Sequence, residues 1–374
     1  MRITFVMPNF GLSGGDRVAA IYAQRLRNRG HEVFVIAGGN KRPRLRDQIK
    51  SVLKGKGWTT STKIAPSHFD TLIDVPCVRL PDYRPIQDAD LPDADVVIAT
   101  WWETAEWVSC LSPEKGAKAY FVQHHEVFDY VPQERARATY KLPLHKIVVA
   151  EWLVQVMRSH YGDTQVSLVP NSVDTTQFNA PARGKQASPT VGMLYAPVSW
   201  KGCDISLKAF SIAAQRVPGL RLVAFGSVPP SPDLPLPAAA TYIQQPNQAI
   251  LKDLYARCDA WLFGSRSEGF GLPILEAMAC RTPVIGTPVG AAPELLANGA
   301  GILVNPEDPE DMARAIEQVC ALSEEAWQAM SDAAYLKATS YTWEDATDRF
   351  EQALKIAIER QFPEQPLEKA TPVA

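Results

Sequence analysis

Residues 258–296 read CDAWLFGSRSEGFGLPILEAMACRTPVIGTPVGAAPELL, and this stretch decides the fold. The apolar run at 260–263 predicts a buried strand, and the small and polar residues at 264–271 predict a turn. A helix is expected over 274–280 and a further buried strand over 283–286. A strand, a glycine-rich turn, a helix and a strand in this order predict a βαβ unit of an α/β fold.

The turn at the start of this helix has the chemistry of a phosphate site. Pro273 suits the first helical position, where its missing N–H costs nothing. Glycines let a backbone approach a ligand closely. The free N–H groups and the positive end of the helix dipole favour an anion such as a diphosphate.

Two carboxylates flank the turn. Glu268 precedes the helix. Glu276 lies about one turn inside it, ~5 Å along the helix axis from Pro273, so both carboxylates can reach one ligand. Carboxylates accept hydrogen bonds from sugar hydroxyls. This arrangement fits a nucleotide sugar better than the alternative of a capping Glu268 and a solvated Glu276, because EGFGLP stands between the two.

Residues 265–295 resemble the donor-site signature of family 4 of the retaining glycosyltransferases, which have the GT-B fold. The resemblance implies two Rossmann-like domains that face a central cleft, and a C-terminal helix that crosses back to the N-terminal domain. In that family the first Glu lies at the transferred sugar, the next residues bind sugar and diphosphate, and the second Glu holds the ribose. The matching residues here are Glu268, Gly269, Phe270, Gly271, Leu272 and Glu276.

Composition limits the possible functions. A chain of 374 residues has room for two domains. Its net charge of −3 argues against nucleic-acid binding. The six cysteines have no CxxC spacing, which predicts reduced thiols of a cytoplasmic protein. No run approaches ~18 apolar residues, so no transmembrane helix is expected.

The N-terminus predicts a second Rossmann-like unit, with strands at 2–7 and 31–36, a glycine-rich turn at 8–15 and a helix at 16–29. It lacks a full GxGxxG and an acidic residue at the end of the second strand, which disfavours a dinucleotide dehydrogenase.

This opening also resembles that of the family 4 enzymes. The resemblance places Gly14 and Gly15 against the donor phosphates, across the cleft from the Glu268 loop. The alternative is that the two glycines only form a tight turn.

A strand at 119–123 is followed by His124, His125 and Glu126. Many family members have a His here, near the transferred sugar, although Gln123 also aligns with that position. We expect at least one of the two histidines to contact the sugar, through its ring or its backbone carbonyl. A metal role is disfavoured, because adjacent residues on an extended segment point to opposite faces.

The family commonly has an Arg and a Lys on the diphosphate after the first strand of the second domain. Lys201 in the sequence SWKG matches the Lys, whereas Met193 stands near the place of the Arg. Arg266 in the neighbouring loop is a candidate substitute for the missing charge.

Three further segments have two interpretations each. Residues 101–104, WWET, follow a strand and either line an acceptor pocket with Glu103 or pack in the core. The DxD copies at 88–90 and 93–95 precede a strand rather than follow it, so we expect a surface loop and no metal or other cofactor. The basic segment 41–63 is either a solvated face or a site for an anionic acceptor or an anionic membrane surface.

These features predict the following organisation: an acceptor-binding domain at 1–179, a linker at 180–189, a nucleotide-sugar-binding domain at 190–340, a crossover helix at 341–360 and a tail at 361–374.

The predicted reaction moves a hexose from a UDP- or GDP-type sugar to a saccharide or lipid-linked saccharide, with retention, in glycan biosynthesis. The predicted catalytic residues are Glu268, His124, His125 and Lys201. The alternatives are a nucleotide-sugar epimerase and a non-catalytic nucleotide-sugar-binding protein. Peripheral contact with the inner face of the membrane is compatible with the basic segment.

Overall fold

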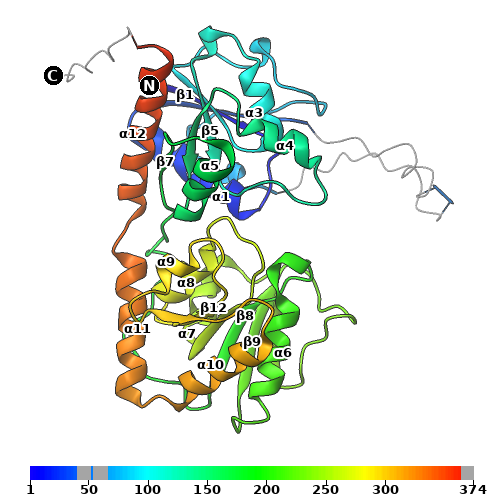
Figure 1. Ribbon diagram of the computed structural model, residues 1–374, viewed down its shortest axis with the longest axis vertical. Coiled ribbons are helices and arrows are strands. Elements are labelled where there is room, and N and C mark those ends of the chain that lie inside the picture. Colours follow the sequence, from blue (N-terminus) through cyan, green and yellow to red (C-terminus); the bar gives the residue numbers. More distant parts are fainter. Residues whose placement is uncertain (40–51, 54–65, 364–374) are drawn as a thin grey trace. The chain divides into compact units, whose positions relative to one another are not determined.

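The computed structural model describes residues 1–39, 52–53 and 66–363. The chain forms two compact units (Figure 1). Unit 1 comprises Met1–Val149, Leu153–Val169 and Thr347–Ala374, and unit 2 comprises Ala150–Trp152 and Pro170–Ala346. Apart from Val52 and Leu53, the basic segment 41–63 lies outside the described residues.

Within the described part of unit 1, a seven-stranded parallel sheet has the order β3-β2-β1-β4-β5-β6-β7. Its strands are short apolar runs, as expected where helices cover both faces of a parallel sheet. The strand order reverses between β1 and β4, and ligands of such sheets bind beyond the carboxyl ends of the strands at this point. The strands are β1 Arg2–Met7, β2 Glu32–Ala37, β3 Cys77–Arg79, β4 Val96–Ala99, β5 Ala117–Val122, β6 His145–Val148 and β7 Ser167–Leu168.

The first helix begins earlier than predicted. Ser13 caps it, because its side chain accepts from the N–H of Asp16. Gly14 and Gly15 are therefore the first helical residues rather than part of the preceding turn. The helices that carry residues of unit 1 are α1 Gly14–Asn28, α3 Trp102–Ser109, α4 Gln133–Thr139, α5 Glu151–Tyr161 and α12 Trp343–Gln361, with 3-10 turns η1 His68–Thr71, η2 Asp88–Asp90 and η3 Pro113–Lys115.

Helix α12 begins in unit 2 and continues into unit 1. In unit 1 the ring of Phe350 stacks on Tyr22 at 4.1 Å and on Phe5 at 6.2 Å between centroids. Phe350 is fully buried, so the last helix contributes to the core of the N-terminal unit. This crossing was expected from the family resemblance.

Unit 2, over its described residues, has a six-stranded parallel sheet with the order β10-β9-β8-β11-β12-β13. The strands are β8 Thr190–Leu194, β9 Arg221–Gly226, β10 Ala240–Gln244, β11 Ala260–Phe263, β12 Val284–Gly286 and β13 Gly301–Leu303. The helices are α6 Cys203–Ala213, α7 Leu251–Ala256, α8 Leu272–Ala279, α9 Ala292–Leu295, α10 Pro309–Ala321 and α11 Glu324–Thr339, with 3-10 turns η4 Ser199–Lys201 and η5 Gln248–Ile250. Two parallel Rossmann-like sheets confirm the predicted α/β fold.

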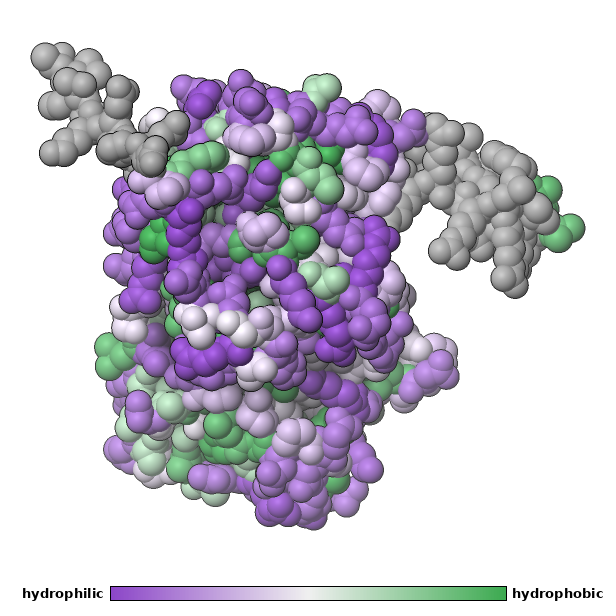
Figure 2. Space-filling view, turned by 45° about the horizontal axis from the view of Figure 1, so that its top comes forward, coloured by the Kyte–Doolittle hydropathy of each residue, from purple (hydrophilic) through white to green (hydrophobic). Residues whose placement is uncertain are grey.

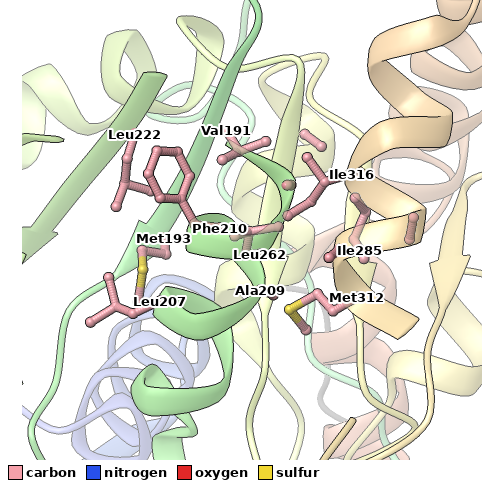
Figure 3. Close-up of a cluster of buried hydrophobic side chains, with 14 of the residues drawn as sticks. Val191, Met193, Leu207, Ala209, Phe210, Leu222, Leu262, Ile285, Met312 and Ile316 are labelled. Carbon is pink, nitrogen blue, oxygen red and sulfur yellow. The ribbon is translucent and has the colours of Figure 1, made fainter. Parts of the chain in front are cut away.

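The core of unit 2 lies between this sheet and helices α6 and α10. Figure 3 shows side chains from β8, β11 and both helices in one cluster. Met193 belongs to this cluster, together with Leu207 and Phe210 of α6.

Hydrophilic residues predominate on the face shown in Figure 2, with hydrophobic residues in patches between them. Among the described residues, no helix is both long enough and apolar enough to cross a membrane.

Candidate functional site

The predicted phosphate turn joins β11 to α8 at the carboxyl edge of the unit 2 sheet. Gly271 caps α8 in a left-handed conformation, with φ 100°. The helix begins at Leu272, so Pro273 is its second residue rather than the predicted first. Pro273 has no N–H, and the Ile274 N–H donates to the Gly271 carbonyl at 3.0 Å. Of the first three helical residues, Leu272 therefore carries the N–H that is available to an anion at this turn.

Lys201 and Glu268 form an ion pair beside this turn. The Lys201 Nζ lies 2.7 Å from Glu268 Oε1, and the Ser265 hydroxyl donates to the same oxygen at 2.8 Å. The Glu268 side chain is 11% exposed and that of Lys201 26%. Both line one open pocket, together with Leu194, Ser206, Ser265 and Pro273. The structure therefore brings together two of the predicted catalytic residues.

Two glycines allow the loops of this pocket to approach each other. Gly202 has φ 57°, and a Cβ there would lie 1.7 Å from the carbonyl oxygen of Gly264. Gly290 has φ 60°, and its Cβ would lie 2.6 Å from the Phe270 oxygen. A side chain at either position would push the Lys201 turn or the Glu268 loop out of place.

Glu276 is the fifth residue of α8 and is 8% exposed. The Tyr255 hydroxyl donates to its Oε2 at 2.8 Å. Glu276 is not among the described residues that line the Lys201 pocket. The predicted ribose contact of Glu276 stays a prediction, and the Tyr255 hydroxyl is one group that holds this carboxylate.

Arg266 has partners of its own. Its guanidinium pairs with Asp204 at 2.7 Å and with Glu307 at 2.6 Å, and it donates to the Ser199 carbonyl at 2.6 Å. These two carboxylates balance its charge, so the structure gives little support to Arg266 as a substitute for the missing Arg.

The position of the missing Arg faces the core. Met193 is 1% exposed within the unit 2 cluster, whereas its neighbour Leu194 lines the pocket. Alternation along a strand sends these two side chains to opposite faces. A charged side chain at 193 would have to leave the core to reach a ligand.

In unit 1 the Gly14–Gly15 start of α1 has one polar neighbour from the end of β5. The Gln123 side chain donates to the Gly15 carbonyl at 3.1 Å. The helix start also carries Asp16, and burial raises the pKa of this carboxyl. Gln123 thus lies beside these glycines, and which residue aligns with the family's His stays open. That this turn faces the Glu268 loop stays a prediction.

The two histidines are held by neighbours within unit 1. His124 Nδ1 lies 3.0 Å from the His125 carbonyl oxygen, and its ring contacts Phe128 at 4.8 Å between centroids. His125 Nε2 lies 2.7 Å from the Tyr161 hydroxyl. Burial, followed by the nearby Arg137 charge, lowers the pKa of His125 to about 4, so this ring is neutral at pH 7. Their contact with a sugar remains a prediction.

In the segment 101–104 the structure shows core packing of one tryptophan, and an acceptor pocket there stays a prediction. Trp102 is 3% exposed and packs in the core, whereas Trp101 is half-buried. The Tyr83 hydroxyl donates to the Glu103 carboxylate.

The carboxylates of the DxD copies have local partners. Asp90 pairs with Arg84 at 2.6 Å, and Asp93 pairs with Lys115 at 2.9 Å. In the part of the chain that the structure describes, no group of three His, Cys, Asp or Glu residues is arranged to hold a metal ion.

The sequence did not predict several supporting contacts. Trp152 donates from its indole N–H to the Gly269 carbonyl at 2.8 Å, and Tyr255 holds Glu276. Trp152 is 117 residues from Gly269 and Tyr255 is 21 residues from Glu276, so no short spacing pattern marks either contact. Ser265 lies inside the quoted turn, so its hydroxyl is the one supporting contact of Glu268 that the sequence could have suggested.

Comparison with known proteins agrees with this geometry. The family Glycosyltransferase Family 4 matches residues 12–177, and Glycosyl transferases group 1 matches residues 189–321. The D-inositol 3-phosphate glycosyltransferase of Mycobacterium avium is 30% identical over 223 residues, which cover 54% of this chain and 52% of that relative. One component of the phosphatidylinositol N-acetylglucosaminyltransferase of Arabidopsis thaliana is 27% identical over 217 residues, 54% of this chain and 47% of that protein. The chain thus spans about half the length of these curated relatives.

Solved structures share the fold over nearly the whole chain. HepE of Anabaena, solved in complex with UDP, superimposes with a TM-score of 0.72 at 16% identity and covers 95% of this chain and 100% of its own. The sucrose-phosphate synthase of Thermosynechococcus elongatus has a TM-score of 0.70 at 16% identity, with 96% and 100% covered. The two family matches lie one on each Rossmann-like unit and together span most of the chain. The chain therefore belongs to family 4 of the glycosyltransferases, with the GT-B fold.

Proposed function

We propose that this protein transfers a hexose from a nucleoside diphosphate sugar to a saccharide or lipid-linked saccharide, with retention of the anomeric configuration. Unit 2 binds the donor, and unit 1 contributes the acceptor side. The observation that carries the proposal is the Lys201–Glu268 pair in a pocket beside the N-terminus of α8. A cation, a free N–H at a helix start and a carboxylate are groups that suit a sugar joined to a diphosphate.

The proposed donor complex changes the partners of this pair. The diphosphate takes Lys201 Nζ and the Leu272 N–H at the start of α8, and Glu268 turns its oxygens to the sugar hydroxyls. The leaving diphosphate gains negative charge as the glycosidic bond breaks, and a fixed cation with N–H donors stabilises that charge. Glu276 is proposed to hold the ribose while Tyr255 keeps its carboxylate in place.

Retention by attack on the same face is favoured by the composition of the pocket. Among the described residues that line it, Glu268 is the single carboxylate. In a double displacement Glu268 would itself have to be the nucleophile that forms the covalent glycosyl-enzyme. The proposal instead assigns its oxygens to the sugar hydroxyls, which leaves the pocket without a second carboxylate for that step. We therefore propose that the acceptor hydroxyl attacks directly, and that no metal ion is required.

Relatives support the class of substrates. HepE has been solved with UDP-glucose, and the names of the curated relatives describe transfer to inositol 3-phosphate and to phosphatidylinositol. A UDP- or GDP-linked donor and a glycan-building acceptor are consistent with these names.

A thermal-shift panel tests the donor part of the proposal. The full chain is heated with UDP, GDP, UDP-glucose, UDP-N-acetylglucosamine and GDP-mannose, each at a concentration well above its expected dissociation constant. A ligand at 100 times its Kd stabilises the folded state by about 2.7 kcal/mol. We expect one nucleotide class to raise Tm clearly, and a flat panel would contradict the proposal.

The same ligand then distinguishes the two alternatives. Conversion of the donor's sugar in the absence of any acceptor would indicate an epimerase. A Tm shift without turnover on any of a set of saccharide acceptors would indicate a binding protein.

We further propose that the basic segment 41–63 contacts the anionic inner face of the cytoplasmic membrane. It carries eight Lys and Arg residues and one acidic residue, Asp47. Each basic residue near such a surface contributes about 1 kcal/mol. Flotation with phosphatidylserine vesicles should recover the full chain but not a variant that lacks this segment, and equal recovery would refute the contact.

A further inference from the structure

Unit 1 has a buried carboxyl group in the loop between β5 and α4. Glu126 follows the two histidines after β5 and is 2% exposed. Burial raises the pKa of this carboxyl to about 8. An ionisable group so deep in a protein is costly unless its hydrogen bonds are satisfied.

Its side chain is bonded to two other elements. Glu126 Oε2 accepts from the backbone N–H of Trp102 at 2.7 Å and from the hydroxyl of Tyr120 at 2.8 Å. Trp102 is the first residue of α3, so the carboxyl group sits at a helix N-terminus, where an acceptor is favourable. The loop after β4 is thereby fixed to a residue of the loop after β5.

The backbone of Glu126 makes a second connection. Its N–H donates to the Tyr140 hydroxyl at 2.8 Å, and that hydroxyl donates to the His124 carbonyl at 3.3 Å. The rings of Tyr120 and Tyr140 stack at 5.5 Å between centroids. One residue thus ties together the start of α3, strand β5 and the His124 loop.

The two loops that Glu126 joins carry an aromatic cluster at the carboxyl edge of the sheet. Phe128 contacts Trp101 at 6.2 Å, Tyr130 at 5.1 Å and His124 at 4.8 Å between ring centroids. Trp101 precedes α3, whereas His124, Phe128 and Tyr130 follow β5. The relative position of these rings therefore depends on the connection between the two loops.

We propose that Glu126 is a positioning residue, which locks the β4–α3 loop to the β5–α4 loop and so sets the geometry of Trp101, His124 and Phe128 for the acceptor. The consequence for the acceptor rests on the proposed function, whereas the lock itself does not. Glu126 touches no reacting atom in this proposal and acts through the residues that it holds.

Hydrogen–deuterium exchange of the full chain tests the lock. Glu126→Ala removes both acceptor bonds, while Glu126→Gln keeps an oxygen that can accept from Trp102 and Tyr120. In Glu126→Ala we expect amide exchange over 101–105 and 123–128 to rise about tenfold or more, because local opening sets the exchange rate. Over β1 and β6 the change should stay below about twofold, and Glu126→Gln should resemble the wild type.

A matched control separates the lock from general destabilisation. Thr4 is buried in β1 of the same unit at 1% exposure, away from both loops, so Thr4→Val reports what an equally buried change does. The inference is overturned if Glu126→Ala raises exchange evenly over unit 1, as Thr4→Val does, or leaves the two loops unchanged.

Kinetics with the donor identified by the thermal-shift panel adds the functional arm. We expect Glu126→Ala to lower kcat for sugar transfer about tenfold while the donor KM stays within about twofold, with recovery in Glu126→Gln. Normal kcat in Glu126→Ala, with loosened loops, would overturn the acceptor role. The exchange experiment uses no nucleotide, so a flat nucleotide panel would contradict the proposed function and leave the lock standing.

Discussion

The candidate residues of the two units differ in how their ionisable groups are held. In unit 2, Lys201 and Glu268 are partly exposed and paired with each other, at 26% and 11% exposure. In unit 1, Glu126 is 2% exposed and bonded to neutral donors, and burial lowers the pKa of His125 to about 4. Charges at an open pocket can exchange partners with a charged ligand. Buried neutral groups instead fix the shape of the loops around them.

The largest expected effect comes from placing a charge in the apolar part of unit 2. Met193→Arg restores the family's residue type at a position that is 1% exposed. We expect it to destabilise the fold by about 3–5 kcal/mol, because an unpaired charge would be buried. Urea unfolding measures this, with Met193→Leu as the volume-matched control. A stable variant with tighter donor binding would show that side chain 193 reaches the diphosphate.

Removing the carboxylate of the open pair should affect chemistry rather than binding. In Glu268→Gln we expect transfer to fall by about 10²–10³, the size seen when one group that stabilises developing charge is removed. The dissociation constant for the nucleoside diphosphate should change little, because Glu268 is assigned to the sugar. Glu307→Gln, which removes an exposed partner of Arg266, serves as control. Full transfer activity in Glu268→Gln would contradict the assignment of Glu268 to the transfer step.

Lys201 and Arg266 provide a direct contrast between two cations near one turn. In Lys201→Ala we expect nucleotide affinity to fall by roughly 10–100-fold, since a hydrogen bond to a charged group contributes about 1.5–3 kcal/mol. Arg266→Ala should stay within about threefold, because its charge is balanced by Asp204 and Glu307. Isothermal titration with the best nucleotide compares them. The reverse ranking would make Arg266 the phosphate ligand.

The buried carboxyl predicts a dependence of stability on pH. Burial raises the pKa of Glu126 from 4.5 to about 8, so the folded state favours the protonated form. The stabilising contribution is complete below pH 4.5 and is lost as pH rises through about 8. Glu126→Gln cannot titrate, so its stability relative to the wild type should increase between about pH 5 and pH 9. Urea unfolding of both proteins across this range measures the difference, and a constant difference would contradict the raised pKa.

The smallest expected effect concerns the start of α1. In Gly15→Ala the new Cβ would lie 3.4 Å from Gln123 Nε2, within ordinary contact distance. Because Gly15 is helical, alanine should raise stability by up to about 1 kcal/mol. The added methyl should cause a small loss of nucleotide-dependent turnover if this turn meets the donor. A steady-state assay beside thermal unfolding separates the two effects, and unchanged turnover would favour a purely structural turn.

The Glu268 turn of unit 2 could be predicted from the sequence because its residues are contiguous. Glu268, the glycines and the start of α8 lie within one stretch, and their spacing follows from helix geometry. The pairing of Lys201 with Glu268 was not predicted, since it joins turns that follow separate strands. The missing Arg was noticed, but only the burial of Met193 shows why its position cannot serve the ligand directly.

The loops after β4 and β5 in unit 1 could be predicted only in outline. The sequence marked the His124–Glu126 segment and the pair Trp101–Trp102 but not the bond between them, because 24 residues separate Trp102 from Glu126. Parallel sheet order brings the ends of β4 and β5 together, and that order is a tertiary property. The sequence predicts the start of α1 two residues late, because a pair of glycines is typical of a turn, whereas the Ser13 cap includes both glycines in the helix.

The central claim is that the pocket at Lys201 and α8 holds a sugar-linked diphosphate. A crystal structure of the complex with the nucleotide that wins the thermal-shift panel tests it most directly. The account predicts a phosphate oxygen within about 2.7–3.2 Å of Lys201 Nζ and of the Leu272 backbone nitrogen at the start of α8, with the Lys201–Glu268 pair separated. A nucleotide bound elsewhere, with that pair intact at 2.7 Å, would contradict the account.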